Sequence, residues 1–248
     1  MTYLALATDY DGTIATEGAV DAATLAALQR WRDRGRKLIL VTGRMMQDWL
    51  TIFPRYAPPE LFDWVVTENG AVLYHPPSQT TKLLASRPPE AFVQALRQQI
   101  GRGEAISESI SGGEFAKLIQ SGQLDPFTVG EIIVATWQPY DRVATALIQA
   151  SSLDLQVILN KRAVMILPQG IDKAFGLEAA LGELDLTPAQ TVGVGDAEND
   201  LHLLELCGFG AAVANALPVV KAQADWVAQG ERGAGVVELI DYLLATDS

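Results

Sequence analysis

The sequence LALATDYDGT at residues 4–13 opens with apolar residues and continues into two carboxylates, Asp9 and Asp11. The apolar run predicts a short buried strand over residues 4–7 that ends where the acidic residues begin. In open parallel sheets, ligands bind beyond the carboxyl ends of the strands, so we expect both carboxylates to project into a site. Gly12 then allows the backbone to turn away sharply.

Two carboxylates this close repel each other unless a cation compensates their charge, and a divalent cation is the natural candidate. One carboxylate can then attack phosphorus, while the other serves as general acid to the leaving oxygen and later as base to water. Backbone N–H groups around Gly12 can bind phosphate oxygens. Aspartate and glycine are also common in ordinary turns, so this motif alone supports the catalytic and the structural interpretation about equally.

Strands and helices alternate on either side of this motif. The expected strands are short and apolar, and they cover residues 4–7, 38–41, 64–67, 191–194 and 210–213. The expected helices have apolar residues at helical spacing, and they cover residues 21–34, 173–181, 199–207, 217–224 and 236–244. This order predicts an α/β fold, a doubly wound parallel sheet with helices on both faces.

The middle of the chain has a different pattern. Helices are expected at residues 89–100 and 140–150, strands at 131–137 and 155–160, and a hairpin turn at 160–162. None of these strands ends in an acidic motif. We therefore expect an inserted α+β domain at residues 80–163, between the two parts of a core domain at residues 1–79 and 164–248.

Two smaller motifs add phosphate-binding groups. Thr42, Gly43 and Arg44 follow a predicted strand, where a threonine hydroxyl and a helix N-terminus can bind a phosphate oxygen. Lys173 begins a predicted helix, a position that opposes the helix macrodipole unless an anion compensates it. A capped strand-to-helix turn and a solvated surface lysine are the simpler interpretations of each motif taken alone.

The sequence GDAEND at residues 195–200 follows another predicted strand. Its three acidic groups and one amide form an oxygen-rich set of the kind that suits Mg²⁺. Asp196 comes directly after the strand and is the better metal ligand, whereas Asn199 and Asp200 open the next helix and could bind through water or hold Lys173. An acidic helix start would explain one or two of these residues but not all of them.

Composition limits the classes of partner. The 248-residue chain has a formal net charge of −12, which disfavours nucleic acid and anionic membranes, and it has one cysteine, Cys207. No apolar run approaches the roughly 20 residues that span a bilayer. We see no basic lead segment of a secretory signal, and one cysteine cannot form an internal disulfide. We therefore expect a cytoplasmic protein, whose oligomeric state the sequence does not indicate.

Together, residues 9–13, 42–44, Lys173 and 195–200 resemble the haloacid dehalogenase (HAD) superfamily. Within it, the chain is similar to the Cof-type phosphatases, which carry an αβ cap of class IIB between the second and third motifs. Further matches are TENGA at residues 67–71 and VANA at residues 213–216. The resemblance implies a Rossmann-like core and covers nearly the whole chain, although the cap matches only in position and length.

The resemblance implies Mg²⁺-dependent hydrolysis of a small phosphorylated metabolite, such as a sugar phosphate or a phosphoglycolate-like compound. Asp9 would be the nucleophile that becomes an aspartyl phosphate, and Asp11 would be the general acid and base. The groups that bind phosphate would be Gly12, Thr42, Gly43, Lys173 and Asn199. The groups that hold Mg²⁺ would be Asp9, the backbone carbonyl of Asp11, and Asp196, with support from Asp200.

Three other functions are weighed against this one. A sugar phosphomutase on the same scaffold stays open, because it differs only in how the cap excludes water. A catalytically silent binding protein should have a broken motif, and no motif is broken. A dehalogenase is disfavoured because it needs neither Asp11 nor the metal cluster. His202 and Ala214 depart from the usual family pattern without touching the expected chemistry.

Overall fold

The structure is a computed structural model that describes residues 2–51, 57–101 and 126–246. It divides into two compact units, each with its own sheet. One unit contains Met1–Leu84 and Ile171–Ser248, and the other contains Ala85–Gly170.

The first unit is built on one eight-stranded sheet. Its strands are β1 (Ala5–Thr8), β2 (Lys37–Val41), β3 (Trp64–Thr67), β4 (Val72–His75), β5 (Thr80–Leu83), β10 (Thr191–Gly195), β11 (Phe209–Ala212) and β12 (Trp226–Val227). They lie in the order β12-β11-β10-β1-β2-β3-β4-β5. The strands from β12 to β3 are parallel, which confirms the predicted α/β class, and β4 and β5 add an antiparallel hairpin at one edge.

Burial explains which strands the sequence predicted. Every residue of β1 and β3 is buried, so both strands read as continuous apolar runs. All four residues of β5 are exposed, and its sequence, Thr-Thr-Lys-Leu, gives no apolar alternation. The hairpin edge was therefore not predicted.

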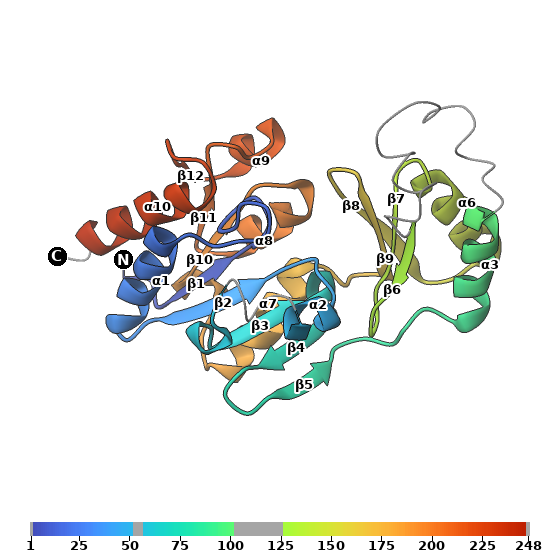
Figure 1. Ribbon diagram of the computed structural model, residues 1–248, viewed down its shortest axis with the longest axis horizontal. Coiled ribbons are helices and arrows are strands. Elements are labelled where there is room, and N and C mark those ends of the chain that lie inside the picture. The colour runs from blue at the N-terminus through green and yellow to red at the C-terminus, as the bar shows by residue number, and fades with distance from the viewer. Residues whose placement is uncertain (1, 52–56, 102–125, 247–248) are drawn as a thin grey trace. The chain divides into compact units, whose positions relative to one another are not determined.

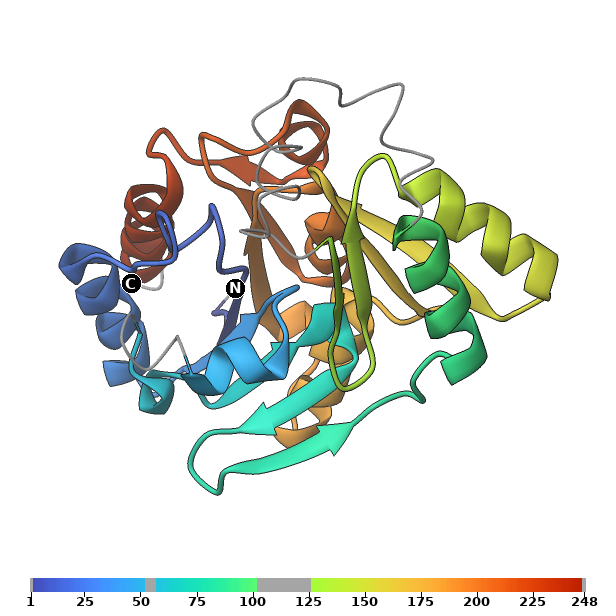
Figure 2. The ribbon, with the colours of Figure 1, turned by 45° about the vertical axis from the view of Figure 1, so that its right-hand side comes forward.

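Helices cover both faces of this sheet (Figures 1 and 2). On one face, α1 (Ala22–Asp33) packs against α10 (Arg232–Thr246), and on the other α7 (Lys173–Glu183) packs against α8 (Leu201–Leu206). Asp21 caps α1, accepting a hydrogen bond from the Thr24 backbone N–H at 2.9 Å. Two short helices, α2 (Met46–Thr51) and α9 (Pro218–Gln223), follow β2 and β11. In the described part of the chain, no helix has both the length and the apolar character needed to cross a membrane.

The second unit has a four-stranded antiparallel sheet with two helices. Its strands are β6 (Phe127–Val129), β7 (Val134–Trp137), β8 (Leu155–Asn160) and β9 (Ala163–Pro168), in the order β6-β7-β9-β8. The helices α3 (Glu90–Gly101) and α6 (Asp141–Ser151) pack against each other, and their apolar residues join those of the sheet in one core. β8 and β9 form the expected hairpin, with Asn160 paired to Ala163.

The boundaries between the units differ from the expected ones by a few residues. The second unit spans Ala85–Gly170, where the sequence suggested 80–163. Strand pairing is the reason, because β5 pairs with β4 of the first unit and β9 pairs with β7 and β8 of the second.

Candidate active site

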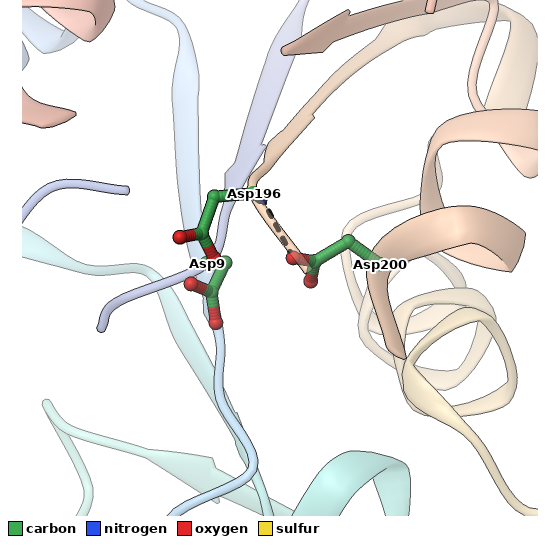
Figure 3. Close-up of side chains that lie close together, drawn as sticks. All are labelled: Asp9, Asp196 and Asp200. Atoms are coloured by element: carbon green, nitrogen blue, oxygen red, sulfur yellow. Dashed lines mark hydrogen bonds between the residues drawn. The ribbon is translucent and has the colours of Figure 1, made fainter. Parts of the chain in front are cut away.

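Three buried aspartates meet at the carboxyl ends of β1 and β10. The two strands pair in parallel with Thr8 opposite Val194, so the residues just beyond them, Asp9 and Asp196, come side by side. Figure 3 shows these two carboxylates at the strand ends and that of Asp200 across from them. Each of the three contributes an oxygen that lies within 4.8 Å of the others. Acidic side chains far apart in sequence thus form one cluster.

Lys173 lies inside this cluster. Its Nζ donates hydrogen bonds to Asp9 Oδ1 at 2.6 Å and to Asp200 Oδ1 at 2.5 Å. The Lys173 side chain is only 1% exposed. Lys173 is the first residue of α7, with Asp172 as N-cap. The two carboxylates supply the negative charge that a lysine at a helix N-terminus requires.

The charges in the cluster are not balanced by Lys173 alone. Burial, together with the charges of Asp200 and Asp196, raises the pKa of Asp9 to about 7, although Lys173 acts in the opposite direction. Burial lowers the pKa of Lys173, but Asp200 and Asp9 outweigh that effect and the net direction is upward. One ammonium therefore faces three carboxylates in a place shielded from water, and such an arrangement suits a divalent cation.

Both carboxylate oxygens of Asp200 accept hydrogen bonds. Its Oδ1 accepts from Lys173, and its Oδ2 accepts from the backbone N–H groups of Asp196 and Ala197 at 2.9 and 3.0 Å. A Cβ at Gly195 would lie 2.5 Å from Asp200 Cβ, so only glycine fits there. These bonds hold both the Lys173 ammonium and the backbone after β10 in place, so Asp200 positions the other members of the cluster.

The predicted helix over residues 199–207 is wrong at its start. The turn Glu198–Asp200 is a 3₁₀ helix, η5, and α8 begins only at Leu201. The tight turn lets the Asp200 side chain reach back to the Asp196 backbone N–H.

Asp11 lies apart from the three clustered aspartates, and its carboxylate is 40% exposed. It forms a bidentate ion pair with Arg44, in which Nε and Nη2 each donate to one carboxylate oxygen at 2.6 Å. This hydrogen bonding raises the pKa of Arg44. The sequence placed Arg44 in a motif but assigned it no role, so this contact was missed.

Gly12 shapes the turn after Asp9, with a φ of 89°. Its N–H donates to Ala15 O at 3.1 Å, and its carbonyl accepts from Asn215 Nδ2 at 2.8 Å. The Gly12 N–H is therefore used inside the turn, and binding of phosphate by backbone N–H groups around Gly12 stays a prediction. Asn215 Nδ2 also reaches Asp196 Oδ2 at 3.2 Å and so ties the turn to the acidic cluster.

Thr42 and Gly43 follow β2, next to the end of β3. Thr42 is buried, its backbone N–H donates to Val66 O, and its hydroxyl oxygen accepts from the Arg44 N–H at 3.2 Å. Since that oxygen acts as the acceptor, the hydroxyl proton can be donated to a bound anion. The backbone here is thus held in place, and the side chain keeps a donor for a ligand.

The turn Glu68–Gly70, the 3₁₀ helix η3, carries a strained backbone beside the site. Glu68 and Asn69 have backbone φ values of 52° and 54°, which residues other than glycine seldom adopt. Gly70 has a φ of 105°, and a Cβ there would lie 1.7 Å from Asp172 O, so the turn packs directly on the start of α7. Strain of this kind persists where the surrounding structure enforces it, often at functional sites.

Asn69 and Asn199 meet across this turn. Asn199 Nδ2 donates to Asn69 Oδ1 at 2.9 Å, and both side chains are buried. Asn69 Nδ2 and Asn199 Oδ1 have no hydrogen-bond partner within the described chain. A buried polar atom without a partner is costly, so this pair offers one donor and one acceptor to a ligand.

Two other residues that the sequence raised have ordinary explanations. Cys207 is buried, and burial raises the pKa of its thiol to about 12, which makes it unreactive. His202 is exposed and lies 2.6 Å from the Asp172 carboxylate.

Comparison with known proteins agrees with this geometry. The family model of haloacid dehalogenase-like hydrolases matches residues 6–100 and 132–240. The chain is 28% identical over 242 residues to a phosphoglycolate phosphatase of Haloarcula marismortui, with 95% of each chain covered. It is 27% identical over 237 residues to a phosphoglycolate phosphatase of Methanothermobacter thermautotrophicus, with 95% of this chain and 96% of the relative covered.

Solved structures share the fold. A haloacid dehalogenase-like hydrolase from Bacteroides thetaiotaomicron superposes with a TM-score of 0.73 at 18% identity, covering 98% of this chain and 100% of the other. A sugar phosphatase of HAD subclass IIB superposes with a TM-score of 0.72 at 19% identity, covering 96% and 98%. The predicted family is therefore confirmed: the chain belongs to the haloacid dehalogenase-like hydrolases, and within them it is a Cof-type phosphatase.

Proposed function

We propose that this phosphatase hydrolyses a small phosphate ester through an aspartyl phosphate on Asp9, with Mg²⁺ as its cofactor. The observation that carries the proposal is the buried cluster in which Lys173 joins Asp9 and Asp200 beside Asp196. Phosphoryl transfer needs an in-line nucleophile and positive charge around the phosphoryl oxygens. The cluster offers a nucleophile, a fixed ammonium and a place for a cation.

The residues fit a magnesium ion. Asp9 and Asp196 would hold it, together with the backbone carbonyl of Asp11, while Asp200 and Asn215 keep the cluster in place. Carboxylate and carbonyl oxygens are the ligands that Mg²⁺ prefers, and the surplus of buried negative charge favours a small divalent cation. When bound, the ion would offset negative charge on the transferring phosphoryl group.

The phosphoryl group would meet donors on several sides. The Lys173 ammonium, the Thr42 hydroxyl and the Asn69 Nδ2 donor can each bind one of its oxygens. These donors lie on rigid elements, because Lys173 is held by two carboxylates and Asn69 by a strained turn. Binding then costs little reorganisation at the moment of reaction.

The reaction follows in two displacements. Asp9 attacks phosphorus, the bond to the ester oxygen breaks, and Asp11 as general acid gives its proton to that oxygen, so an alcohol leaves. Asp11, now ionised, takes a proton from water as the water attacks phosphorus. The bond between Asp9 and phosphorus breaks, which releases inorganic phosphate and restores both carboxyl groups.

The expected substrates are sugar phosphates and phosphoglycolate-like compounds. Support comes from relatives named phosphoglycolate phosphatase that align with nearly the whole chain. A formal charge of −12 also makes a small anion that binds one local cationic site a better partner than nucleic acid or a membrane surface. The cytoplasmic address remains a prediction.

The direct test is phosphate release from a panel that includes 2-phosphoglycolate and hexose phosphates. We expect turnover with Mg²⁺ and its loss when EDTA removes the ion. Hexose 1-phosphate should give free sugar and phosphate, whereas conversion to another hexose phosphate would show a mutase. No turnover on any ester in Mg²⁺ would contradict the proposal.

Metal binding has its own expected readout. At 100 times its Kd, Mg²⁺ stabilises the folded state by about 2.7 kcal/mol, which corresponds to a rise in Tm of roughly 5–10 °C for a chain of this size. Because burial raises the pKa of Asp9 to about 7, a proton competes with the ion below that pH. The Tm shift at a fixed, subsaturating Mg²⁺ concentration should therefore be larger at pH 8 than at pH 6.

A matched pair of variants makes this measurement specific. Asp196→Asn should lose most of the Mg²⁺-dependent Tm shift, because it removes a buried ligand of the ion. Asp241→Asn removes an exposed carboxylate that is paired with Arg30 on α1, and it should keep the whole shift. Equal shifts in the two variants would place the ion elsewhere.

A further inference from the structure

Asp11 is held by one side chain in a defined geometry. The Arg44 guanidinium donates Nε–H to Asp11 Oδ2 and Nη2–H to Asp11 Oδ1, both at 2.6 Å. The planar fork of arginine matches the two oxygens of a carboxylate, so this contact fixes the orientation of the Asp11 side chain.

Arg44 is itself anchored next to the phosphate-binding groups. Its backbone N–H donates to Thr42 Oγ1 at 3.2 Å, and its carbonyl accepts from the Glu68 N–H at 2.8 Å. Its guanidinium carbon lies 5.9 Å from the centre of the Tyr10 ring, and the Tyr10 hydroxyl donates to Gly18 O at 2.7 Å. The guanidinium therefore projects from backbone fixed by two neighbouring strand ends.

The ion pair leaves Asp11 able to transfer a proton. A carboxylate has about four lone-pair sites, and Arg44 uses one on each oxygen. The remaining site on either oxygen can carry the proton for a leaving group. A proton donor contributes most when its direction is fixed, because the reaction then does not wait for the side chain to find it.

We propose that Arg44 is the positioning residue for Asp11, and that it holds this carboxyl group in the orientation from which the proton reaches the leaving oxygen. This role rests on the phosphatase mechanism proposed above. Arg44 itself does not exchange a proton with the substrate, so its removal should reproduce part of the loss caused by removing Asp11. If Arg44 only held the loop in place, its removal would lower the rate of hydrolysis of all substrates by the same factor.

The leaving group of the substrate separates these two roles. An alkyl phosphate expels an alkoxide that needs a proton, whereas p-nitrophenyl phosphate expels a stable phenolate that needs almost none. General acid catalysis contributes about 10²–10⁴-fold. Arg44→Met should therefore lower kcat/KM for 2-phosphoglycolate by about 10²-fold, and for p-nitrophenyl phosphate by less than about threefold. The ratio of the two rates does not depend on how much of the variant is folded.

A double-variant cycle tests whether Arg44 acts through Asp11. Asp11→Asn should show the same leaving-group dependence with a larger loss on the alkyl ester. Adding Arg44→Met to Asp11→Asn should lower that rate by less than about twofold, because residues that act as a unit are not additive. Arg44→Lys keeps the charge but lacks the fork, so its rate should fall between those of wild type and Arg44→Met.

An exposed ion pair provides the matched control. Arg30 Nη2 lies 2.6 Å from Asp241 Oδ1, and both side chains are about half exposed at the outer surface of α1 and α10. Arg30→Met should leave both esters at the wild-type rate.

Two results would overturn the positioning role of Arg44. One is an equal loss on the alkyl and aryl esters in Arg44→Met, and the other is a full additional loss in the double variant. A wild-type enzyme that hydrolyses no ester of the panel, or Asp9→Asn that still hydrolyses the esters the wild type does, would instead overturn the proposed mechanism and the Arg44 role with it.

Discussion

Replacement of Asp9 by asparagine should lower the turnover of every phosphate ester by at least about 10⁴-fold, because an amide cannot serve as the nucleophile. The variant should keep its fold, since asparagine has the shape of aspartate and removes one negative charge from a buried group of three. Phosphate release under saturating Mg²⁺, together with a urea unfolding curve, checks both statements.

The aryl ester makes the Asp9 result diagnostic. Loss of an acid should matter little for p-nitrophenyl phosphate, whereas loss of the nucleophile should abolish its hydrolysis as fully as that of 2-phosphoglycolate. Asp9→Asn should therefore inactivate the enzyme on both esters, in contrast to Asp11→Asn. Asp33→Asn, which changes an exposed carboxylate on α1, should be fully active. Retention of a tenth of the wild-type activity by Asp9→Asn would remove the nucleophile assignment.

The approach of Asp9 and Asp196 could be predicted from the sequence, because it depends on backbone pairing alone. Each follows a buried apolar strand, and parallel strands present their carboxyl ends at the same edge of a sheet. The location of Lys173 followed from a similar argument, since a lysine at a helix start needs an anion nearby. Patterns of one or two residues sufficed where the backbone alone determined the geometry.

Contacts that depend on side-chain direction could not be predicted in this way. The Asp11–Arg44 pair joins two loops, and nothing in the spacing of 33 residues indicates that the guanidinium turns towards that carboxylate. The Asn69–Asn199 pair requires a left-handed backbone at Asn69, which tertiary packing enforces and local propensity opposes. The hydrogen bond from the Gly12 N–H to Ala15 O is a further example, because it lies inside a turn whose bonds the sequence does not specify.

The unit boundaries show the same limit at a larger scale. The inserted region could be recognised because its predicted strands do not end in acidic motifs. The residues at its two ends, however, belong to whichever sheet pairs with them. β5 is polar and exposed, so its membership in the first sheet depends on backbone hydrogen bonds to β4 that carry no hydrophobic signature. β9 is apolar enough for either sheet, and it is the pairing with β7 and β8 that places it in the second.

Replacement of Lys173 by methionine should be the most destabilising single change at the site. Methionine fills a similar volume, so packing is nearly kept, but Asp9 and Asp200 lose the ammonium to which both are bonded. Breaking a buried ion pair by removing one partner typically costs about 3–5 kcal/mol, because the other charge stays buried without compensation. We expect that loss in the free energy of unfolding, measured in urea at pH 8 without divalent ions.

The same variant should respond to pH and Mg²⁺ in a way that identifies charge as the cause. In Lys173→Met, acidification should recover stability, because protons neutralise the Asp9 carboxylate, which has lost its partner and whose pKa burial raises. Mg²⁺ should also recover part of the loss by supplying positive charge, while activity stays low because the phosphoryl group has lost a donor. Lys82→Met breaks the exposed Lys82–Glu183 pair and should cost less than about 1 kcal/mol under all these conditions. If Lys173→Met unfolds at the same urea concentration as the wild type at pH 8, the buried carboxylates do not depend on this ammonium, and the charge argument for the site fails.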